Sequence, residues 1–321
     1  MASITLTEAA KLATDDFKSG IIESVVTTDN FYEILPFMGI EGNSLRYTRE
    51  NAPAPVAAVA VGENIGPGAV AGNNQAERQA AMDSATFTEV HVNLTTILGT
   101  TEMNGLIQAG QSGDNDQTAA QIESKVKSAG RKYRDMLING VGGVTNEFPG
   151  LLSLVPAGQK VATAANGSNL SFGIIDELVD KVKDKDGQVD YLMMHSRTLR
   201  SFKALLRSLG GASILDVLKL PSGKQVMVYN GTPIFTNDNI PTDQAQGASG
   251  NICTTIFAGT LDDGSSSMGI AGATTKVDAG LAIHKVGRTR EKDEEAYQVV
   301  WYCGLALFSE LGIASVSGIL D

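Results

Sequence analysis

A stretch of 33 residues with almost nothing to bury lies between two segments of alternating polarity. Residues 51–83 hold ten Ala, four Gly and three Pro, and they include no aromatic residue and no Leu. The flanking segments, 43–50 and 89–98, alternate apolar and polar side chains, which is the period of a half-buried β-strand. Loops longer than about 12–15 residues are uncommon inside compact proteins. The sequence therefore predicts a long two-stranded arm with a poorly structured tip.

The N-terminal segment also predicts contacts with other chains. Between Thr7 and Phe37 the apolar residues come at mixed spacing, which favours one or two short helices, interrupted at Gly20 and ended by Leu35-Pro36. Such a segment is too short to enclose a core and is interpreted as an arm. An isolated two-stranded hairpin is likewise marginally stable in water. Both segments indicate a chain that gains order against partner surfaces.

The middle of the chain predicts one long amphipathic helix. Asp114 or Asp116 can cap its start, and Asn139-Gly140 can end it. About 23 residues at 1.5 Å each make a rod of roughly 35 Å. Its apolar residues recur at spacings of three and four, namely Ile122, Val126, Ala129, Tyr133 and Met136 or Leu137. Its other face carries opposite charges four residues apart, Glu123 with Lys127 and Arg131 with Asp135.

The remainder of the chain predicts short helices alternating with strands. Ser171 and Ser196 are expected to cap two helices, the second of which closes at Gly210-Gly211. Asn230-Gly231 is a strong signal for a tight hairpin between two strands. The expected strands are 189–194, 225–229, 232–236, 252–258, GLAIHKV at 280–286, and 296–308. The last is apolar on both faces and should be central in its sheet.

The acidic excess lies in the first two-fifths of the chain. Residues 1–124 hold 16 acidic and 5 basic side chains, a net charge of −11, whereas residues 125–321 hold 20 of each. Non-specific binding to phosphate needs a surplus of Lys and Arg, so nucleic acid is not expected as a tight ligand. One helix surface is basic, and we interpret it as a partner for the acidic part of a neighbouring chain, ahead of a phosphate patch or a solvated face. Its residues are Lys125, Lys127, Arg131, Lys132 and Arg134.

Neither the histidines nor the cysteines have the spacing of a metal or catalytic site. His91, His195 and His284 share no ligand spacing, and we interpret all three as structural. Cys253 and Cys303 lie in apolar, strand-like runs. They are expected to be buried free thiols, with a disulfide as the alternative.

Two loops resemble functional sites only superficially. Gly62, Gly66 and Gly68 fit neither the dinucleotide nor the P-loop spacing. The pair Asp262-Asp263 in a Gly/Ser stretch is interpreted as a solvated turn and not as a cation site. We therefore expect no catalytic, cofactor-binding or metal site, and no enzyme activity.

Neither a membrane span nor a secretion signal is expected. No run approaches the roughly 18 apolar residues of a membrane helix. The opening MASITLTEAAKLATDD lacks the basic and then apolar pattern of a signal peptide. We expect a chain made in a cytoplasm, with no membrane partner.

The order of these parts resembles the tailed-bacteriophage major capsid proteins of the Hong-Kong-97 type. IESVVTTDNFYEILPF at 22–37, GNSLRYTREN at 42–51 and VGENI at 61–65 look like that family's arm leading into its extended loop. DELVDKVKDKDGQVDYLMMHSRTLRSFKALLRS at 176–208 is similar to its helix–strand–helix. Segments 229–241, 257–264 and 297–319 resemble its closing parts, so the resemblance covers nearly the whole chain.

The resemblance implies an α+β shell subunit that forms pentamers and hexamers of an icosahedral phage head around double-stranded DNA. It implies a virion location after assembly in the cytoplasm of a bacterial host, with a portal protein and, as an optional partner, a decoration protein. Four parts are expected: an N-terminal arm at 1–43, an extended loop over a neighbour at 44–98, a peripheral domain with a spine helix at 99–164 and 291–321, and an axial domain at 165–290.

Two features depart from relatives of that family. Some of them cross-link their shells through a lysine of the extended loop and an asparagine of a neighbour, and this chain has no lysine between Lys18 and Lys125. We therefore expect a non-covalent shell. The arm and loop use up the residues before the long helix, which leaves no room for an N-terminal scaffolding domain. We therefore expect a separate scaffold protein.

Two other function classes stay open at this point. The first is the shell of an encapsulin-type nanocompartment, which shares the capsid fold and encloses a cargo enzyme. The second is a soluble α/β enzyme with an unrecognised site. An enzyme would form a small oligomer, whereas a shell protein would give megadalton particles or capsomers.

Overall fold

The computed structural model describes residues 31–52, 54, 56, 84–111, 117–143, 146–184, 187–208, 216–220, 223–248, 250–277, 280–288 and 292–320. The chain divides into two compact units. The smaller unit includes residues 98–130 and 283–300, and the larger unit includes residues 29–97, 131–282 and 301–321.

The larger unit is built around a nine-stranded sheet. Its strands follow the order β5-β16-β12-β7-β10-β9-β8, with β11 paired to β12 and β6 paired to β16. Their bounds are β5 Lys160–Val161, β6 Ser168–Asn169, β7 Tyr191–Met194, β8 Asp216–Lys219, β9 Gln225–Tyr229, β10 Thr232–Thr236, β11 Gln244–Gln246, β12 Asn251–Gly259 and β16 Ile313–Leu320. All four residues of β7 are buried, which is typical of a strand covered on both faces.

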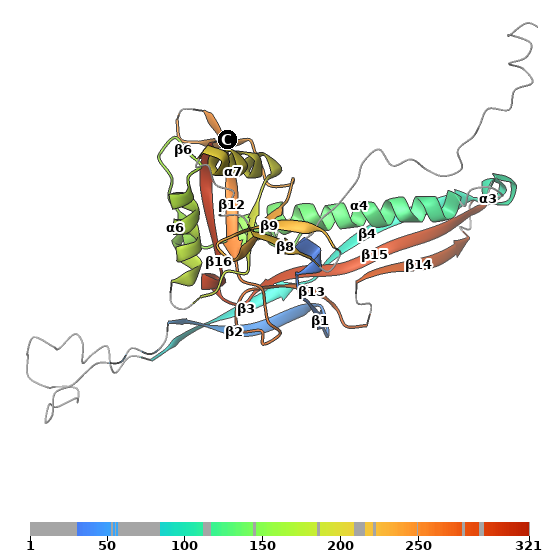
Figure 1. Cartoon of the computed structure of the whole chain (residues 1–321). Helices are drawn as coiled ribbons and strands as arrows, with labels where there is room; N and C mark the ends of the chain where they lie inside the picture. The colour runs from blue at the N-terminus through green and yellow to red at the C-terminus, as the bar shows by residue number, and fades with distance from the viewer. Residues whose placement is uncertain are drawn as a thin grey trace, which may run out of the picture. The chain divides into compact units, whose positions relative to one another are not determined.

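Two helices, α6 (Phe172–Lys183) and α7 (Ser196–Ser208), pack on one face of this sheet (Figure 1). The side chain of Ser171 accepts a hydrogen bond from the backbone N–H of Ile174, so the predicted cap of α6 is confirmed. The predicted cap of α7 is wrong by one residue, because Ser196 is already helical. His195 takes that place, and its Nδ1 accepts a hydrogen bond from the Arg197 N–H at 3.0 Å.

An aromatic residue near the start of the described chain packs on the same sheet. Phe31, in the short 3-10 helix η1 (Phe31–Glu33), is 1% exposed and meets the rings of Tyr191 and Phe235 at centroid distances of 5.0 and 5.6 Å. The following strand β1 (Phe37–Ile40) pairs in parallel with β13. The last part of the predicted arm is therefore part of the folded larger unit, because Phe31 and Leu35 are buried in it.

A second sheet has five strands, ordered β1-β13-β15-β14, with β4 also paired to β15. The bounds of its other strands are β4 Thr95–Asn104, β13 Ile270–Thr275, β14 Leu281–Arg288 and β15 Glu294–Leu307. The sequence predicted that the strand at 296–308 is central, and the pairing of β15 with β13, β14 and β4 confirms it.

The long helix α4 (Gln117–Asn139) has the predicted length of 23 residues and ends where predicted. Ala129, Tyr133 and Met136 are buried, whereas Ile122 and Val126 are half-buried. In the smaller unit the first part of α4 runs along β4 and β15 (Figure 1), and α3 (Gly105–Gln111) follows β4. The other short helices are α5 Leu151–Leu154, η2 Ala157–Gln159 and η3 Glu310–Gly312. No helix in the described ranges is long and apolar enough to cross a membrane.

Each of the two large sheets combines strands from the predicted peripheral and axial ranges or from segments outside them. Strand β16 falls in the predicted 291–321 segment, but it pairs with β12 in the nine-stranded sheet. Strands β13 and β14 fall in the predicted 165–290 segment, but they belong to the five-stranded sheet with β15. This arises because the chain passes between the two sheets three times, from β4 through α4 to β5, from β12 to β13, and from β15 to β16.

The last two of these passages lie side by side within the larger unit. One runs from β12 through Thr260–Gly269 to β13, and the other runs from β15 through Phe308–Gly312 to β16. The Thr260 N–H donates to Gly312 O at 2.8 Å, and the Phe308 N–H donates to Gly269 O at 3.0 Å. Because β12 also pairs with β16 and β13 with β15, a two-stranded antiparallel ribbon continues from one sheet into the other.

The predicted two-stranded arm forms a separate sheet in the larger unit. Strand β2 (Ser44–Ala52) pairs antiparallel with β3 (Thr86–Asn93), from Ser44 opposite Asn93 to Ala52 opposite Thr86. Figure 1 shows this ribbon beside β1 and β13. Of the predicted coreless stretch at 51–83, residues 51 and 52 belong to β2, and residues 57–83 lie outside the described residues.

Candidate assembly site at the base of the hairpin

One face of the β2–β3 hairpin packs against the larger unit. Leu45, Tyr47 and Val92 belong to a small apolar cluster, and Val92 is 7% exposed. Their partners are Met38, Ala271, Ala306 and Phe308. The rings of Tyr47 and Phe308 lie 5.3 Å apart. The alternation seen in the sequence therefore selects this face of the arm for burial.

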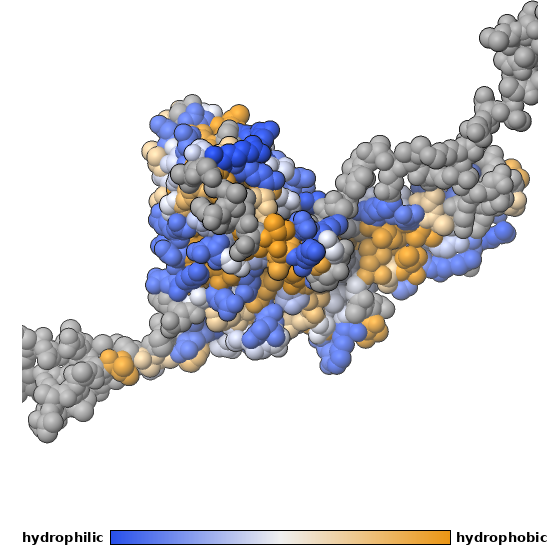
Figure 2. All heavy atoms as spheres, in the orientation of Figure 1, coloured by the Kyte–Doolittle hydropathy of each residue, from blue (hydrophilic) through white to orange (hydrophobic). Residues whose placement is uncertain are grey.

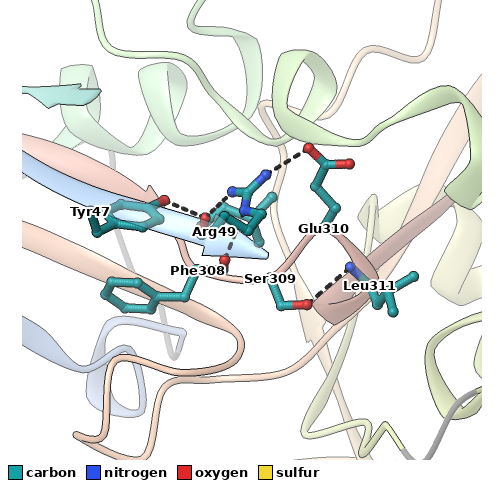
Figure 3. Close-up of polar contacts among 7 residues, drawn as sticks. Tyr47, Arg49, Phe308, Ser309, Glu310 and Leu311 are labelled. Carbon is teal, nitrogen blue, oxygen red and sulfur yellow. Dashed lines mark hydrogen bonds and ion pairs between the residues drawn. The ribbon is translucent and has the colours of Figure 1, made fainter. Parts of the chain in front are cut away.

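Two polar side chains of β2 fix this face to the end of β15 (Figure 3). The Tyr47 hydroxyl donates to Leu307 O at 2.5 Å. Arg49 donates from Nη2 to Leu307 O at 2.6 Å, and from Nε to Phe308 O at 2.9 Å. Its Nη1 also donates to the Glu310 carboxylate at 2.6 Å. One guanidinium group therefore binds three successive acceptors along the passage from β15 to β16.

These carbonyls need donors because they stand where the β13–β15 ladder ends. Leu307 is the last residue of β15 and lies opposite Ile270. Buried backbone carbonyls without a partner are costly, and Arg49 supplies charge-assisted donors for two of them. The Arg49 side chain is only 14% exposed. Burial raises the pKa of Tyr47, and the Arg49 charge partly opposes that rise, so the hydroxyl keeps the proton that it donates.

The opposite face of the hairpin is exposed. Arg46 and Glu89 form an ion pair there, with side-chain exposures of 67% and 40%. Phe87 is 63% exposed, and His91 stands opposite Arg46 in the ladder. Single exposed apolar side chains are common on protein surfaces, so Phe87 does not by itself mark an interface.

A half-open groove of about 550 Å³ lies at the root of the hairpin. Its lining residues are Gly42, Asn43, Asn93, Leu94, Thr96, Thr275 and Tyr302. None of these residues carries a charge, so the groove offers no carboxylate to a metal ion and no cation to a phosphate.

The three histidines lie on three different elements. His195 caps α7, His91 lies on the exposed face of β3, and His284 is exposed on β14. Among the residues that the structure describes, no group of three or more His, Cys, Asp or Glu side chains is placed to hold a metal ion.

The cysteines and the Asp262-Asp263 pair lie where their side chains support the fold. Cys253 and Cys303 are buried free thiols, so that prediction is confirmed. Asp262 and Asp263 accept hydrogen bonds from the backbone N–H groups of Ser266 and Ser265 at 2.9 Å in an exposed turn. The glycine-rich segment at 62–68 lies outside the described residues.

The basic surface of α4 is partly neutralised within the chain. Lys127 pairs with Glu123 at 2.8 Å, as predicted. Lys132 pairs with Glu147 at 2.7 Å and lies 3.7 Å from Asp135, and the Glu147 contact raises the pKa of Lys132. These contacts favour a solvated face over a surface held ready for a neighbour or for phosphate.

The sequence did not identify the Arg49 anchor as a site. The signal was present, because Arg49 shares a strand face with the apolar residues Leu45 and Tyr47. A cation on the buried side of a strand usually has partners of its own. What the pattern could not give was the identity of those partners, which lie about 260 residues later in the chain.

Comparisons with solved structures agree with this architecture over the whole chain. A chain of the holo-SrpI encapsulin complex from Synechococcus elongatus PCC 7942 is similar with a TM-score of 0.72 at 17% identity, covering 99% of this chain and 96% of that chain. A chain of Microbacterium phage Oxtober96 gives 0.65 at 13% identity, with both chains fully covered. The capsid of a native GTA particle gives 0.64 at 15% identity, again over both full chains. The fold is therefore the predicted α+β capsid fold of the Hong-Kong-97 type.

Sequence comparison identifies the family. No curated protein matches the chain. The model of the SU10 major capsid protein family, however, matches residues 12–246, well over half of the 321 residues. This range includes the hairpin, the long helix and the helix–strand–helix that the sequence phrases had indicated. The chain thus belongs to the SU10 major capsid protein family.

Proposed function

We propose that this major capsid protein assembles into pentamers and hexamers of an icosahedral phage head that encloses double-stranded DNA. The family match over residues 12–246 carries the proposal, since it makes the chain a shell-forming subunit of a virion capsid. A chain of phage Oxtober96 and the capsid of the GTA particle, with the same fold over their full lengths, support it. In this proposal the chain has a structural role and is not an enzyme.

The hairpin is the part that we assign to contacts between subunits. Its inner face is fixed to its own chain through Tyr47 and Arg49, and its outer face exposes Phe87. We propose that residues 44–98 overlie a neighbouring subunit. We also propose three further parts: an N-terminal arm at 1–43, a peripheral domain at 99–164 and 291–321, and an axial domain at 165–290. Strand β16 lies in the range of the peripheral domain but pairs with β12 of the nine-stranded sheet.

The other components are proposed from the capsid role. They are a separate scaffold protein, a portal and, in some shells, a decoration protein. The packaged DNA lies beside the shell without specific binding, which suits the net charge of −11. Assembly takes place in the cytoplasm of a bacterial host, without a membrane partner.

An encapsulin-type compartment is the second candidate, because the SrpI encapsulin chain has the same fold with a TM-score of 0.72. The two functions differ in what the particle contains. Purified particles should therefore be treated with nuclease, opened, and analysed for both DNA and protein. We expect double-stranded DNA that was protected from the nuclease.

The alternatives give different results in the same experiment. Particles that hold a second protein and no protected DNA would support the compartment instead. A small oligomer in analytical ultracentrifugation, with no megadalton species under any assembly condition, would contradict both and favour a soluble enzyme.

A further inference from the structure

The hairpin is anchored at the place where the chain passes from one sheet to the other. The polar contacts of Tyr47 and Arg49 end on Leu307, Phe308 and Glu310, which lie at the end of β15 and in the connection from it through η3 to β16. This connection is half of the ribbon that joins the five-stranded sheet to the nine-stranded sheet. The base of the hairpin, a third sheet, thus contacts the five-stranded sheet and the connection that leads from it to the nine-stranded sheet.

The geometry of the junction leaves little space for a different arrangement. Gly269 has a φ of +79°, and a Cβ there would lie 2.6 Å from the backbone of Leu261. A Cβ on Gly312 would meet the backbone of Gly269 at 3.0 Å. The two passages are therefore in close backbone contact, and Arg49 approaches them from the hairpin side.

Arg49 suits this place because of its shape. A guanidinium group presents five N–H donors in a planar fork, so three of its nitrogens can bind separate acceptors at once. Here Nη2, Nε and Nη1 bind Leu307 O, Phe308 O and the Glu310 carboxylate. A lysine ammonium is a single compact charge and cannot span these acceptors in the same way.

We infer that Arg49 is a positioning residue that sets the direction of the hairpin relative to the rest of the larger unit. Tyr47 and Glu310 assist it, one by a second bond to Leu307 O and the other by holding the outer end of the guanidinium. The apolar cluster around Tyr47 and Phe308 holds the hairpin against the unit, but it does not fix an angle because apolar contacts are not directional. The consequence for shell geometry rests on the proposed function.

The chain supplies a matched control. Arg46 lies on the same strand, three residues before Arg49, but on the exposed face, where it pairs with Glu89. Arg46→Ala and Arg49→Ala thus remove the same group from one strand. Only the second change removes contacts to the junction.

The first experiment measures direction without requiring a shell. Spin labels are placed on the unassembled full chain at Glu50→Cys in the hairpin and Lys224→Cys before β9, both exposed, while the native cysteines are buried. Pulsed electron resonance should give one narrow distance distribution for the parent protein and for Arg46→Ala. For Arg49→Ala the width should at least double. Equal widths for the two arginine variants would overturn the inference.

The second experiment measures assembly. Each variant is assembled together with the proposed scaffold protein. Electron microscopy should show uniform closed shells for Arg46→Ala, and at least a tenfold lower fraction of such shells for Arg49→Ala. Arg49→Lys should recover less than half of the fraction of closed shells that Arg49→Ala loses. Glu310→Gln and Tyr47→Phe each remove one contact, so they test the anchor if Arg49→Ala does not fold. If Glu310→Gln and Tyr47→Phe both gave the distance distribution and the shells of the parent protein, the positioning role of Arg49 would be contradicted.

The two failures are distinguishable. If the parent protein forms no shells when the scaffold protein is supplied, the proposed function fails while the distance measurement still decides the role of Arg49. If shells form normally and the widths do not change with Arg49→Ala, the positioning role fails while the capsid function stands.

Discussion

Cys303 holds its proton unusually firmly. It lies in β15 opposite Thr274, and its side chain is fully buried. Burial raises the pKa of this thiol from 9.0 to about 12, because a thiolate would lose its hydration. In the unfolded chain the same thiol ionises near its ordinary value. Cys303 therefore links folding to pH in the alkaline range.

We therefore predict that the free energy of unfolding contributed by Cys303 falls as the pH rises. The folded pKa lies above the unfolded one, so the contribution to stability is complete below about pH 9 and is lost as pH rises toward 12. At pH 10.5 the loss should be about 2 kcal/mol relative to pH 8, by the usual linkage relation. Urea unfolding at both pH values, compared with Cys303→Ala, measures it. A pH dependence that is the same in both proteins would argue against the assignment.

Arg46 and Arg49 show how far a single residue can be understood from sequence. Both lie on one alternating strand, and the alternation correctly puts them on opposite faces. Exposed ion pairs such as that of Arg46 contribute roughly 0–1 kcal/mol, whereas hydrogen bonds to charged groups contribute about 1.5–3 kcal/mol. That difference depends on acceptors near residue 308, and no pattern near residue 49 indicates them.

Among the elements, the β9–β10 hairpin has the clearest local cause. Asn230 and Gly231 have φ values of 50° and 86°, the conformation that two-residue hairpin loops require and that Asn-Gly favours. Tyr229 then lies opposite Thr232 in the ladder. The turn fixes the register of both strands, which explains why the sequence predicted this hairpin with its bounds.

A matched glycine pair tests this cause. A Cβ on Gly231 or on Gly130, in α4, would contact nothing within 4 Å, so the two sites differ mainly in backbone conformation. Gly231→Ala should destabilise the chain by about 1 kcal/mol because of its positive φ. Gly130→Ala should stabilise it by about 0.5–1 kcal/mol through helix propensity. Chemical denaturation measures both, and shifts of the same sign would refute the explanation.

Elements with a strong period were predicted well, and those with small residues were not. The 23 residues of α4 and the cap of α6 follow from spacing and from one serine. Strand β13, with the sequence IAGATT, has no apolar alternation to detect. Its burial comes from β1 and β15, which are distant in sequence. The cap of α7 failed for a different reason, because His195 does what the adjacent serine was expected to do.

At the scale of the whole molecule, strands of one sheet alternate along the sequence with strands of the other. A division into consecutive ranges therefore could not assign β16, β13 and β14 to their sheets. The overall fold was nevertheless predictable, because the order of arm, hairpin, long helix and α/β region is itself distinctive. The neighbours of the hairpin in an assembled shell depend on other chains, and local sequence patterns carry no information on them.

The absence of lysine between Lys18 and Lys125 gives a prediction for the assembled particle. An isopeptide bond from the extended loop needs a lysine amine there, so the subunits should be held by non-covalent contacts alone. Purified particles boiled in detergent should run on a denaturing gel as one band near 33.6 kDa. A ladder of multimers that survives boiling and reduction would contradict this prediction.

The ribbon that joins the two sheets also has a mechanical meaning. Its two passages, Thr260–Gly269 and Phe308–Gly312, cross the junction in opposite directions and are hydrogen-bonded to each other. A pull that separates the sheets along the ribbon therefore stretches two covalent backbones, and not only a packed interface. Tension in the wall of a capsid would reach the hairpin through the same junction, because Arg49 is bound to Leu307 and Phe308 on one of the two stretched passages.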